Sequence, residues 1–270
     1  MIEPVRTTLM NPGSAGKVRI PTVRTWLKKT LIYVSKGRLR MSFFFFVAEG
    51  LNICRSFRKS AGRLECSVCI NRVPFFLHHA SDLRISWNAV CPNCNSRSRH
   101  RGLWYLYGKV LDEISTQLKI LHVAPEPIFY PLFKANERVS YITADYLLED
   151  VDYKEDLQKL SFGDASFDLI LCNHVIEHVP DDDAAFSEIS RVLNAGGRAI
   201  ITIPGDYSRN KTVYFNHLRF NGHYRDYGMD VVDKMNKYFS EVIYIDLSTF
   251  NSKALNYGIK ANELAFVCTK

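Results

Sequence analysis

The stretch from Phe167 to Pro204, FDLILCNHVIEHVPDDDAAFSEISRVLNAGGRAIITIP, decides the fold. It begins with the apolar run FDLILC, which is typical of a strand buried on both faces. Polar residues follow at 173–178, and the acidic start at 181–183 leads into an amphipathic helix that reaches about Leu193. Two glycines end that helix, and the apolar run at 198–204 predicts the next strand. The stretch therefore predicts half of a βαβ layer, with polar residues where open parallel sheets bind ligands.

The flanking sequence continues this alternation of strands and helices. The expected strands are 119–124, 139–145, 157–162, 167–173, 198–204, 241–247 and 264–269, and the expected helices are 127–136, 182–193 and 231–239. Such alternation predicts an α/β fold with a parallel sheet and helices on both faces. A connecting helix is expected at 100–117, in front of this domain.

Length and composition limit the class of protein. A chain of 270 residues with a 47% hydrophobic share can form one large α/β domain and a small appendage. The sequence contains no run of 18 apolar residues, so no membrane-spanning helix is expected. The first residues also lack the apolar core of a secretory signal. We therefore expect a cytoplasmic protein.

The net charge of +7 is unevenly distributed. Residues 1–63 contain 13 Lys or Arg and 2 Glu, whereas the remainder contains 22 Lys or Arg and 26 Asp or Glu. The basic, partly helical amino-terminal arm at 1–61 could bind an anionic membrane surface or RNA. Binding to a membrane surface would place the protein at the membrane periphery. A solvated tail, or a helix that packs on its own domain, is the alternative.

Four of the seven cysteines form two Cys-x-x-Cys pairs, Cys66 with Cys69 and Cys91 with Cys94. Two such pairs supply four thiolates at tetrahedral reach, which predicts a structural Zn²⁺ ion in a module at 62–99. His78, His79 and His100 lie near enough in sequence to replace one thiolate. Four protein ligands leave no open position, so the metal is expected to be structural.

Residue types at the ends of the expected strands predict a nucleoside site. Asp145 ends the second strand about twenty residues after the first turn, where a carboxylate can accept hydrogen bonds from ribose hydroxyls. The first turn, HVAPEP at 122–127, contains no glycine, but Ala124 is small enough for a ligand to approach the backbone. Glu126 either caps the following helix or meets a positive group of the ligand.

The 167–204 stretch closely resembles the corresponding segment of class I S-adenosylmethionine (SAM)-dependent methyltransferases of the type 11 kind. The turn at 122–127 resembles a subset with Ala-Pro-Glu, and the second cysteine pair resembles a zinc-ribbon-like module that precedes some bacterial methyltransferase domains. The resemblance covers about residues 91–245 and implies a Rossmann-like seven-stranded sheet within a domain at 100–270. The SAM-binding residues that it implies are His122, Ala124, Pro125, Glu126, Asp145, Tyr146, Asp156, Leu157, Asn173 and His174.

SAM is already activated for transfer, so the protein must align an acceptor and, for a hydroxyl, remove a proton. His174, His178 and His223 are the candidate bases. The spacing of His174, Glu177 and His178 also matches an inverted zinc-protease motif, but that motif requires a helix, and Pro180 disfavours one here. Glu177 and His178 are expected to stabilise the loop or to hold a divalent cation.

An insertion at 206–227, rich in basic and aromatic residues, is expected either to shape acceptor choice or to pack on the domain as a lid. The leading hypothesis is methyl transfer to a small molecule, such as a hydroxyl of a glycan-type or biosynthetic metabolite. One alternative is an RNA methyltransferase that grips RNA with the zinc module and the basic arm. Another is a non-catalytic zinc-ribbon interaction protein.

Overall fold

The computed structural model describes residues 22–56, 64–81, 84–113, 117–215, 222–251, 256–261 and 263–270. Parts of the expected basic arm (1–21 and 57–61) and of the expected insertion (216–221) lie outside these ranges. The chain forms two compact units, one reaching to Val110 and including Leu247–Ala261, the other running from Leu111 to Asp246 and including the carboxyl-terminal strand. The domain boundaries expected from the sequence remain predictions.

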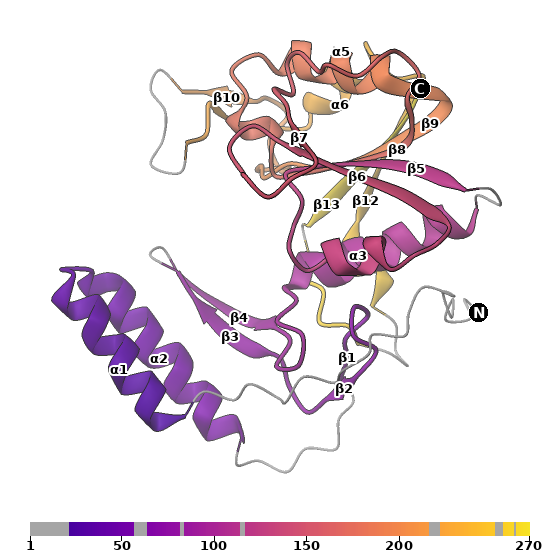
Figure 1. Ribbon diagram of the computed structural model, residues 1–270. Coiled ribbons are helices and arrows are strands. Elements are labelled where there is room, and N and C mark those ends of the chain that lie inside the picture. Colours follow the sequence, from indigo (N-terminus) through magenta and orange to yellow (C-terminus); the bar gives the residue numbers. More distant parts are fainter. Residues whose placement is uncertain are drawn as a thin grey trace. The chain divides into compact units, whose positions relative to one another are not determined.

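The first unit contains a helical hairpin of α1 (Val23–Ser35) and α2 (Leu39–Ser56) (Figure 1). Thr22 begins α1 with a capping box to Thr25. Helix α2 is held to strand β3 by Asn52, which accepts a 2.7 Å hydrogen bond from the His78 amide and donates a 3.0 Å one to its carbonyl. The part of the arm that α1 and α2 form is therefore a folded element that packs on its own unit.

Short antiparallel hairpins and one long helix complete the first unit. The elements are β1 (Leu64–Glu65), β2 (Arg72–Val73), β3 (Leu77–Ala80), β4 (Ile85–Val90), α3 (Ser98–Asp112) and the 3₁₀ turn η2 (Leu247–Phe250). Arg101 of α3 is fully buried and donates to the carbonyls of Ser96, Tyr257 and Gly258, and its guanidinium lies 3.8 Å from the centre of the Phe76 ring. Arg101 thus ties residues far apart in sequence into one core.

The second unit is built on one seven-stranded sheet with the order β12-β13-β9-β8-β5-β6-β7. Its strands are β5 (Leu118–Val123), β6 (Val139–Asp145), β7 (Tyr153–Lys154), β8 (Phe167–Asn173), β9 (Leu193–Thr202), β12 (Glu241–Asp246) and β13 (Leu264–Thr269). Five strands are parallel, and β13 pairs antiparallel with both β9 and β12. The seven-stranded arrangement confirms the prediction.

Helices cover the sheet because strand side chains alternate between its faces. Helix α5 (Asp182–Val192) and helix α6 (Val231–Met235) share one apolar cluster with Leu121 and Val123 of β5, and Figure 1 shows them on the same face. His122 points to the opposite face, toward α4 (Tyr130–Lys134). There Phe133 of α4 stacks on Tyr141 of β6 at 5.1 Å.

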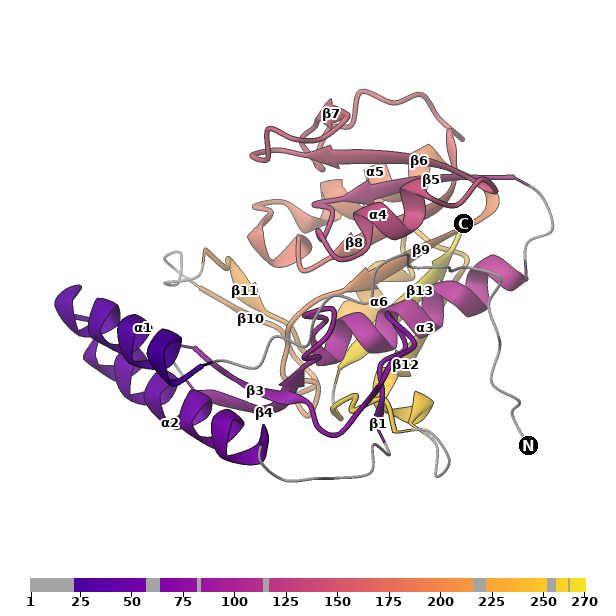
Figure 2. The same cartoon turned by 60° about the horizontal axis from the view of Figure 1, so that its bottom comes forward.

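The prediction of a strand at 157–162 is wrong. The segment forms a turn instead, and the edge strand is the two-residue β7, which lies beside β6 (Figure 2). Strand β9 begins at Leu193, before the glycines, because an irregularity in its pairing with β8 accommodates residues 194–197. Helices α4 and α6 are each shorter than expected. The insertion contains a small hairpin of β10 (Val213–Tyr214) and β11 (Arg225–Asp226).

Candidate functional site

A cavity of about 550 Å³ opens at the carboxyl ends of β5, β6 and β8, within the second unit. Its volume falls in the range of about 300–1,000 Å³ that is usual for small-molecule sites. Strand β5 has β6 on one side and β8 on the other, so the cavity lies at a topological switch point of the sheet. The predicted site residues that line it are Ala124, Asp145, Tyr146, Asp156, Leu157, His174 and His178.

Two non-glycine residues with positive φ form the edges of this cavity. Ala124 follows β5 with φ +50°, and His174 follows β8 with φ +54°. The amide of each still bonds to the neighbouring strand, Ala124 to the Ala144 carbonyl and His174 to that of Thr202, both at 2.8 Å. The chain thus turns away sharply at both strand ends. A left-handed residue costs about 1 kcal/mol without glycine, and such strain is concentrated at functional sites.

Asp145 lies at the end of β6 with its carboxylate on the cavity. Its Oδ1 accepts hydrogen bonds from the amides of Leu147 and Leu148, both at 2.6 Å. These bonds fix the side chain in a local turn. A preorganised carboxylate at this strand end fits the ribose role that the sequence predicts.

The loop after β7 forms the wall of the cavity beyond β6. Buried Glu155 accepts a 2.8 Å hydrogen bond from the Ser161 amide, and Asp156 Oδ1 accepts one from the Gln158 amide at 2.9 Å. Glu155 and Gln158 also line the cavity, although the sequence did not indicate them. Their signal was weak because both belong to an acidic, turn-rich loop in which several carboxylates compete.

Four of the predicted SAM-binding residues do not line the cavity: His122, Pro125, Glu126 and Asn173. His122 is fully buried, with Nδ1 2.7 Å from the Tyr141 hydroxyl and Nε2 3.2 Å from Glu126 Oε2. Asn173 donates to the same Glu126 oxygen at 3.0 Å. Burial raises the pKa of Tyr141 well above its usual value, so its hydroxyl keeps its proton. These residues form a hydrogen-bonded support behind the turn at Ala124.

Three histidines surround Glu177, which lies on the 3₁₀ turn η1 (Ile176–His178). Glu177 Oε1 lies 3.4 Å from Nδ1 of His174 and 3.8 Å from Nε2 of His178. The His178 and His223 rings meet edge to face at 4.8 Å. Burial lowers the pKa of His223, which favours its neutral form. His174 and His178 line the cavity, as does Tyr224 of the insertion, which the sequence analysis did not single out; His223 does not.

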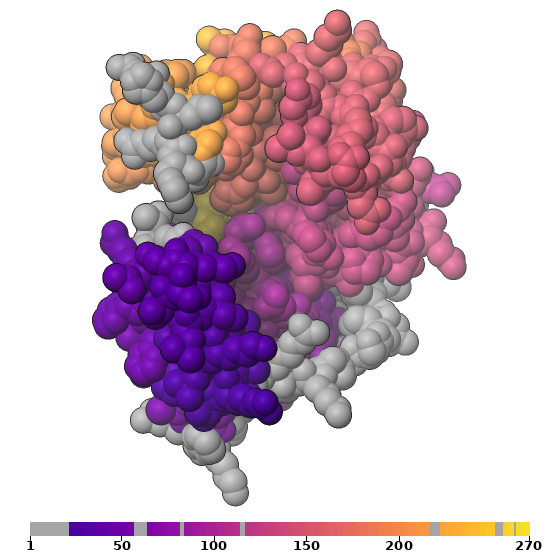
Figure 3. All heavy atoms as spheres, turned by 60° about the vertical axis from the view of Figure 1, so that its left-hand side comes forward, coloured from indigo at the N-terminus to yellow at the C-terminus, as the bar shows by residue number. Residues whose placement is uncertain are grey.

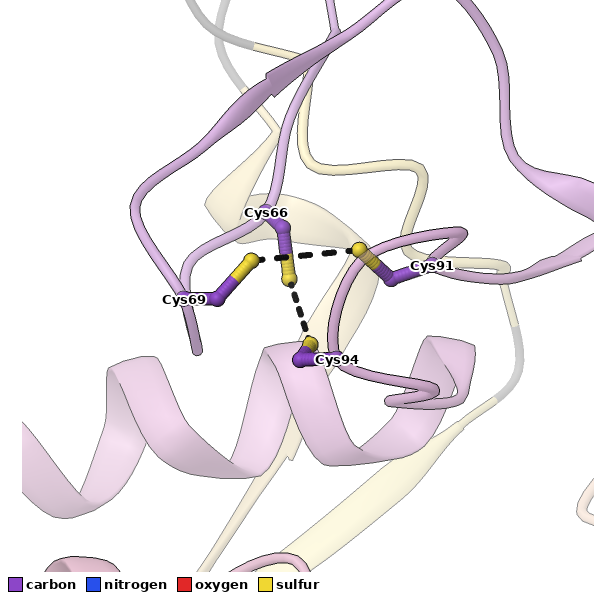
Figure 4. Close-up of side chains that lie close together, drawn as sticks. All are labelled: Cys66, Cys69, Cys91 and Cys94. Carbon is purple, nitrogen blue, oxygen red and sulfur yellow. Dashed lines mark hydrogen bonds between the residues drawn. The ribbon is translucent and has the colours of Figure 1, made fainter. Parts of the chain in front are cut away.

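The four predicted zinc ligands lie together in the first unit (Figure 4). The Sγ atoms are 3.6 Å apart for Cys66 and Cys94 and 3.9 Å apart for Cys69 and Cys91. A tetrahedral Zn²⁺ with Zn–S bonds of about 2.3 Å separates its sulfurs by roughly 3.8 Å. The thiols therefore fit a structural zinc ion with a closed coordination shell.

Both cysteine pairs use the same backbone turn. The amide after the second cysteine donates to the carbonyl of the first, from Ile70 to Cys66 at 2.7 Å and from Asn95 to Cys91 at 3.0 Å. Ile70 and Asn95 both have positive φ, of +57° and +64°. This repeated turn directs four thiols toward one point. Burial also raises the pKa of Cys66, and a bound cation supplies the positive charge that buried thiolates require.

Comparisons with known proteins relate part of the chain to methyltransferases. Residues 123–201 match the sequence model of a family described as "Methyltransferase domain". A curated relative, the tRNA U34 carboxymethyltransferase of Nautilia profundicola, is 28% identical over 150 residues, which are 48% of this chain and 47% of the relative. The chain thus spans about half the length of the curated relative that it matches.

Solved methyltransferase structures are similar at low identity. The 1,6-didemethyltoxoflavin-N1-methyltransferase of Burkholderia thailandensis is 12% identical, with a TM-score of 0.46 over 64% of this chain and 78% of that one. The phosphoethanolamine N-methyltransferase 2 of Haemonchus contortus is 17% identical, with a TM-score of 0.40 over 56% and 39%. Among the residues that the structure describes, no helix is long and apolar enough to cross a membrane.

The family that residues 123–201 match uses SAM, and the strand order and cavity described above provide the expected place for it. Residues 123–201, which lie in the second unit, therefore match a SAM-dependent methyltransferase domain, and the first unit adds a four-cysteine cluster suited to zinc.

Proposed function

We propose that the chain transfers a methyl group from SAM to an acceptor that enters the cavity beside His174. The observation that carries this proposal is the cavity at the switch point, bounded by the left-handed turns at Ala124 and His174. SAM, when bound, supplies an electrophilic methyl group. The protein then has to bind SAM and the acceptor, orient the acceptor toward the methyl group, and remove the acceptor's proton.

The roles of the cavity residues follow from their places on the strands. Asp145 is proposed to accept hydrogen bonds from the ribose hydroxyls, and Asp156 and Leu157 to contact the adenine. His174 is proposed to accept the acceptor's proton, because it lines the cavity and its Nδ1 faces Glu177 Oε1 at 3.4 Å. We propose that the proton resides on Nδ1, beside this carboxylate, which leaves Nε2 as the basic nitrogen.

A hydroxyl of a small biosynthetic or glycan-type molecule is the acceptor that we propose. The cavity is of small-molecule size, and Tyr224 from the insertion adds an aromatic wall. RNA is the second candidate acceptor, favoured by the curated relative, whose name refers to tRNA. A non-catalytic protein would need neither a base nor an open cavity.

Methyl-labelled SAM tests the proposal directly. The protein is incubated with labelled SAM and either a metabolite extract or total tRNA, and the label is followed into each pool. We expect label in the metabolite pool and a loss of about 10²–10⁴-fold in rate for His174→Asn, the usual share of a general base. His79→Gln, a change in the first unit, should leave the rate unchanged. Label only in tRNA would replace the small-molecule acceptor, and no label in either pool from folded, SAM-binding protein would reject the enzyme.

We also propose that the α1–α2 hairpin attaches the protein to an anionic membrane surface. Residues 22–56 contain seven basic side chains and one acidic one. Apolar side chains at helical spacing remain exposed between them, and Figure 3 shows α1 and α2 in indigo. These exposed side chains are Val23, Leu27, Leu31 and Val34 on α1 and Leu39, Phe43 and Phe46 on α2. Apolar stripes flanked by Lys and Arg suit a lipid interface, whereas RNA binding needs the charges alone.

Sedimentation with vesicles tests the membrane proposal. We expect binding to vesicles that contain phosphatidylserine and much weaker binding to pure phosphatidylcholine, because each basic residue contributes about 1 kcal/mol near an anionic surface. The double variant Leu31→Gln, Phe43→Gln should lose vesicle binding although its charge is unchanged. Equal binding by this variant, or no binding by the unmodified protein, would contradict the proposal. Salt-sensitive tRNA binding without vesicle binding would assign the hairpin to RNA.

A further inference from the structure

Glu177 is a buried carboxylate whose surroundings are incomplete. Its side chain is 1% exposed, and its Oε2 has no hydrogen-bond partner within the described part of the chain. The imidazoles of His174 and His178 lie within 4 Å of Oε1, at 3.4 and 3.8 Å. A buried carboxylate oxygen without a partner is costly, so this oxygen is expected to meet a cation or a donor that the described residues do not supply.

The orientation of His178 points to a cation. Its Nδ1 lies 3.2 Å from the Gly222 carbonyl, which can only accept, so Nδ1 carries the proton. Nε2 therefore presents its lone pair, and it lies 3.8 Å from Glu177 Oε1. The His178 nitrogen and the Glu177 oxygen are both acceptors, so they cannot form a hydrogen bond with each other, but both can bind the same metal ion. Histidines that bind metals typically donate their other nitrogen to a carbonyl in this way.

The insertion brings a third ligand to the same place. The Tyr224 amide donates a 2.9 Å hydrogen bond to the Glu177 carbonyl, which fixes the neighbouring His223 beside η1. Ligand atoms of Glu177, His178 and His223 all lie within 4.8 Å of one another. Sequence alone does not show this, because His223 is 45 residues away from His178.

A second acidic group, Asp181–Asp183, offers a contrast. Asp182 pairs with Arg225 at 3.1 Å and with Lys234 at 2.7 Å, and Asp183 pairs with Lys234 at 3.1 Å. Asp181 caps α5 through the Ala184 amide. The protein's own cations and amides already neutralise this group, whereas the ion pairs that Glu177 forms within the described residues are with the imidazoles of His174 and His178.

We propose that Glu177, His178 and His223 bind one divalent transition-metal ion. Two imidazoles and a carboxylate favour ions such as Mn²⁺, Fe²⁺ or Zn²⁺ over Mg²⁺ and Ca²⁺, which prefer oxygen ligands. Three protein ligands leave coordination positions open, unlike the closed four-cysteine cluster. His178 and Tyr224 line the cavity, so the open side can reach a bound molecule. If the proposed methyl transfer holds, the ion binds the acceptor hydroxyl and lowers its pKa, which eases proton removal by His174.

Mn²⁺ titration followed by electron paramagnetic resonance tests this site. The protein is first given one equivalent of Zn²⁺, which the four thiolates bind preferentially. We expect one Mn²⁺ per chain, and an affinity at least about tenfold weaker in Glu177→Gln and in His223→Gln. Asp183→Asn removes a carboxylate from the contrasting acidic group and should bind Mn²⁺ like the unmodified protein. Circular dichroism confirms that each variant is folded.

The outcomes are distinct. Absence of bound Mn²⁺, unchanged affinity in a folded Glu177→Gln variant, or loss of binding only in Asp183→Asn would each overturn the site. Calorimetry with SAM on the same samples separates this inference from methyl transfer. Mn²⁺ binding without SAM binding keeps the metal site and rejects the proposed function, whereas SAM binding without Mn²⁺ binding does the reverse.

Discussion

Left-handed residues mark both sites of this chain. Ile70 and Asn95 complete the two cysteine turns, and Ala124 and His174 flank the cavity. None is a glycine, although glycine would adopt these conformations without strain. Ile70 is the most costly of the four, because a β-branched residue rarely has positive φ. The protein therefore holds these turns through hydrogen bonds of the surrounding structure rather than through local preference.

Replacing Ile70 by glycine should stabilise the zinc-loaded first unit. The change removes strain of about 1–2 kcal/mol, part of which is offset by the greater freedom of glycine in the unfolded chain. Ile70 is 54% exposed, so little packing is lost. Thermal melting of the zinc-loaded protein should show a higher Tm, with a smaller gain for Asn95→Gly because asparagine tolerates this conformation. A lower Tm for Ile70→Gly would contradict this reading of the turn.

Residue chemistry alone predicted part of the cavity. Asp145 and His174 were predictable because Asp145 ends one apolar strand and His174 directly follows another. The absence of glycine at 122–127 concealed the conformation of this turn, since nothing in the sequence shows that Ala124 takes a glycine-like conformation. His122 and Glu126 were expected at the cofactor, yet they bond to each other, because a buried histidine satisfies its nitrogens with the nearest partners.

At the scale of elements, α5 is joined to the loop before β8 by one charge cluster. Glu188 accepts two hydrogen bonds from Arg191 and one from the Leu160 amide at 2.8 Å. Arg191 in turn donates to the carbonyls of Leu160 and Phe162. The hydrogen bonds from Arg191 hold the pKa of Glu188 below its usual value.

Replacing Glu188 by glutamine should therefore have a pH-dependent cost. A carboxylate with a lowered folded-state pKa stabilises the fold above its unfolded pKa of about 4.3, and the effect is lost as pH falls through the folded value. We expect Glu188→Gln to lower the stability by about 1–2 kcal/mol at pH 7 and to match the unmodified protein once both are acidified below that window. Urea unfolding at several pH values measures this, with the exposed Glu137→Gln as control. A cost independent of pH would exclude the charge as its cause.

The strands that consist of continuous apolar runs were predicted best. The bounds of β6, β8 and β13 match the expectation, because their buried side chains leave a continuous apolar signal. The failure at 157–162 has the same cause. Leu157 and Leu160 are buried side chains of a turn, and their apolar character resembles that of a strand. The actual edge strand, β7, is two residues long and exposed, so it gives no apolar signal.

At the scale of the whole chain, two compact units carry two different sites. The cysteine cluster belongs to the first unit and the cavity to the second. Removal of zinc should therefore unfold the cysteine module, which has only short strands, while the sheet remains folded. Melting in the presence of a chelator should show an early loss of the first unit and a nearly unchanged transition of the second. Loss of SAM binding on chelation would contradict this division.

Calorimetric titration of SAM into the zinc-loaded protein tests the central claim most directly, namely that the cavity above β5, β6 and β8 binds SAM. We expect one SAM per chain. We also expect at least a tenfold loss of affinity in Asp145→Ala, and a smaller loss in Asp145→Asn, which keeps the acceptor for the Leu147 and Leu148 amides. No binding by the folded protein, or unchanged affinity in Asp145→Ala, would contradict it.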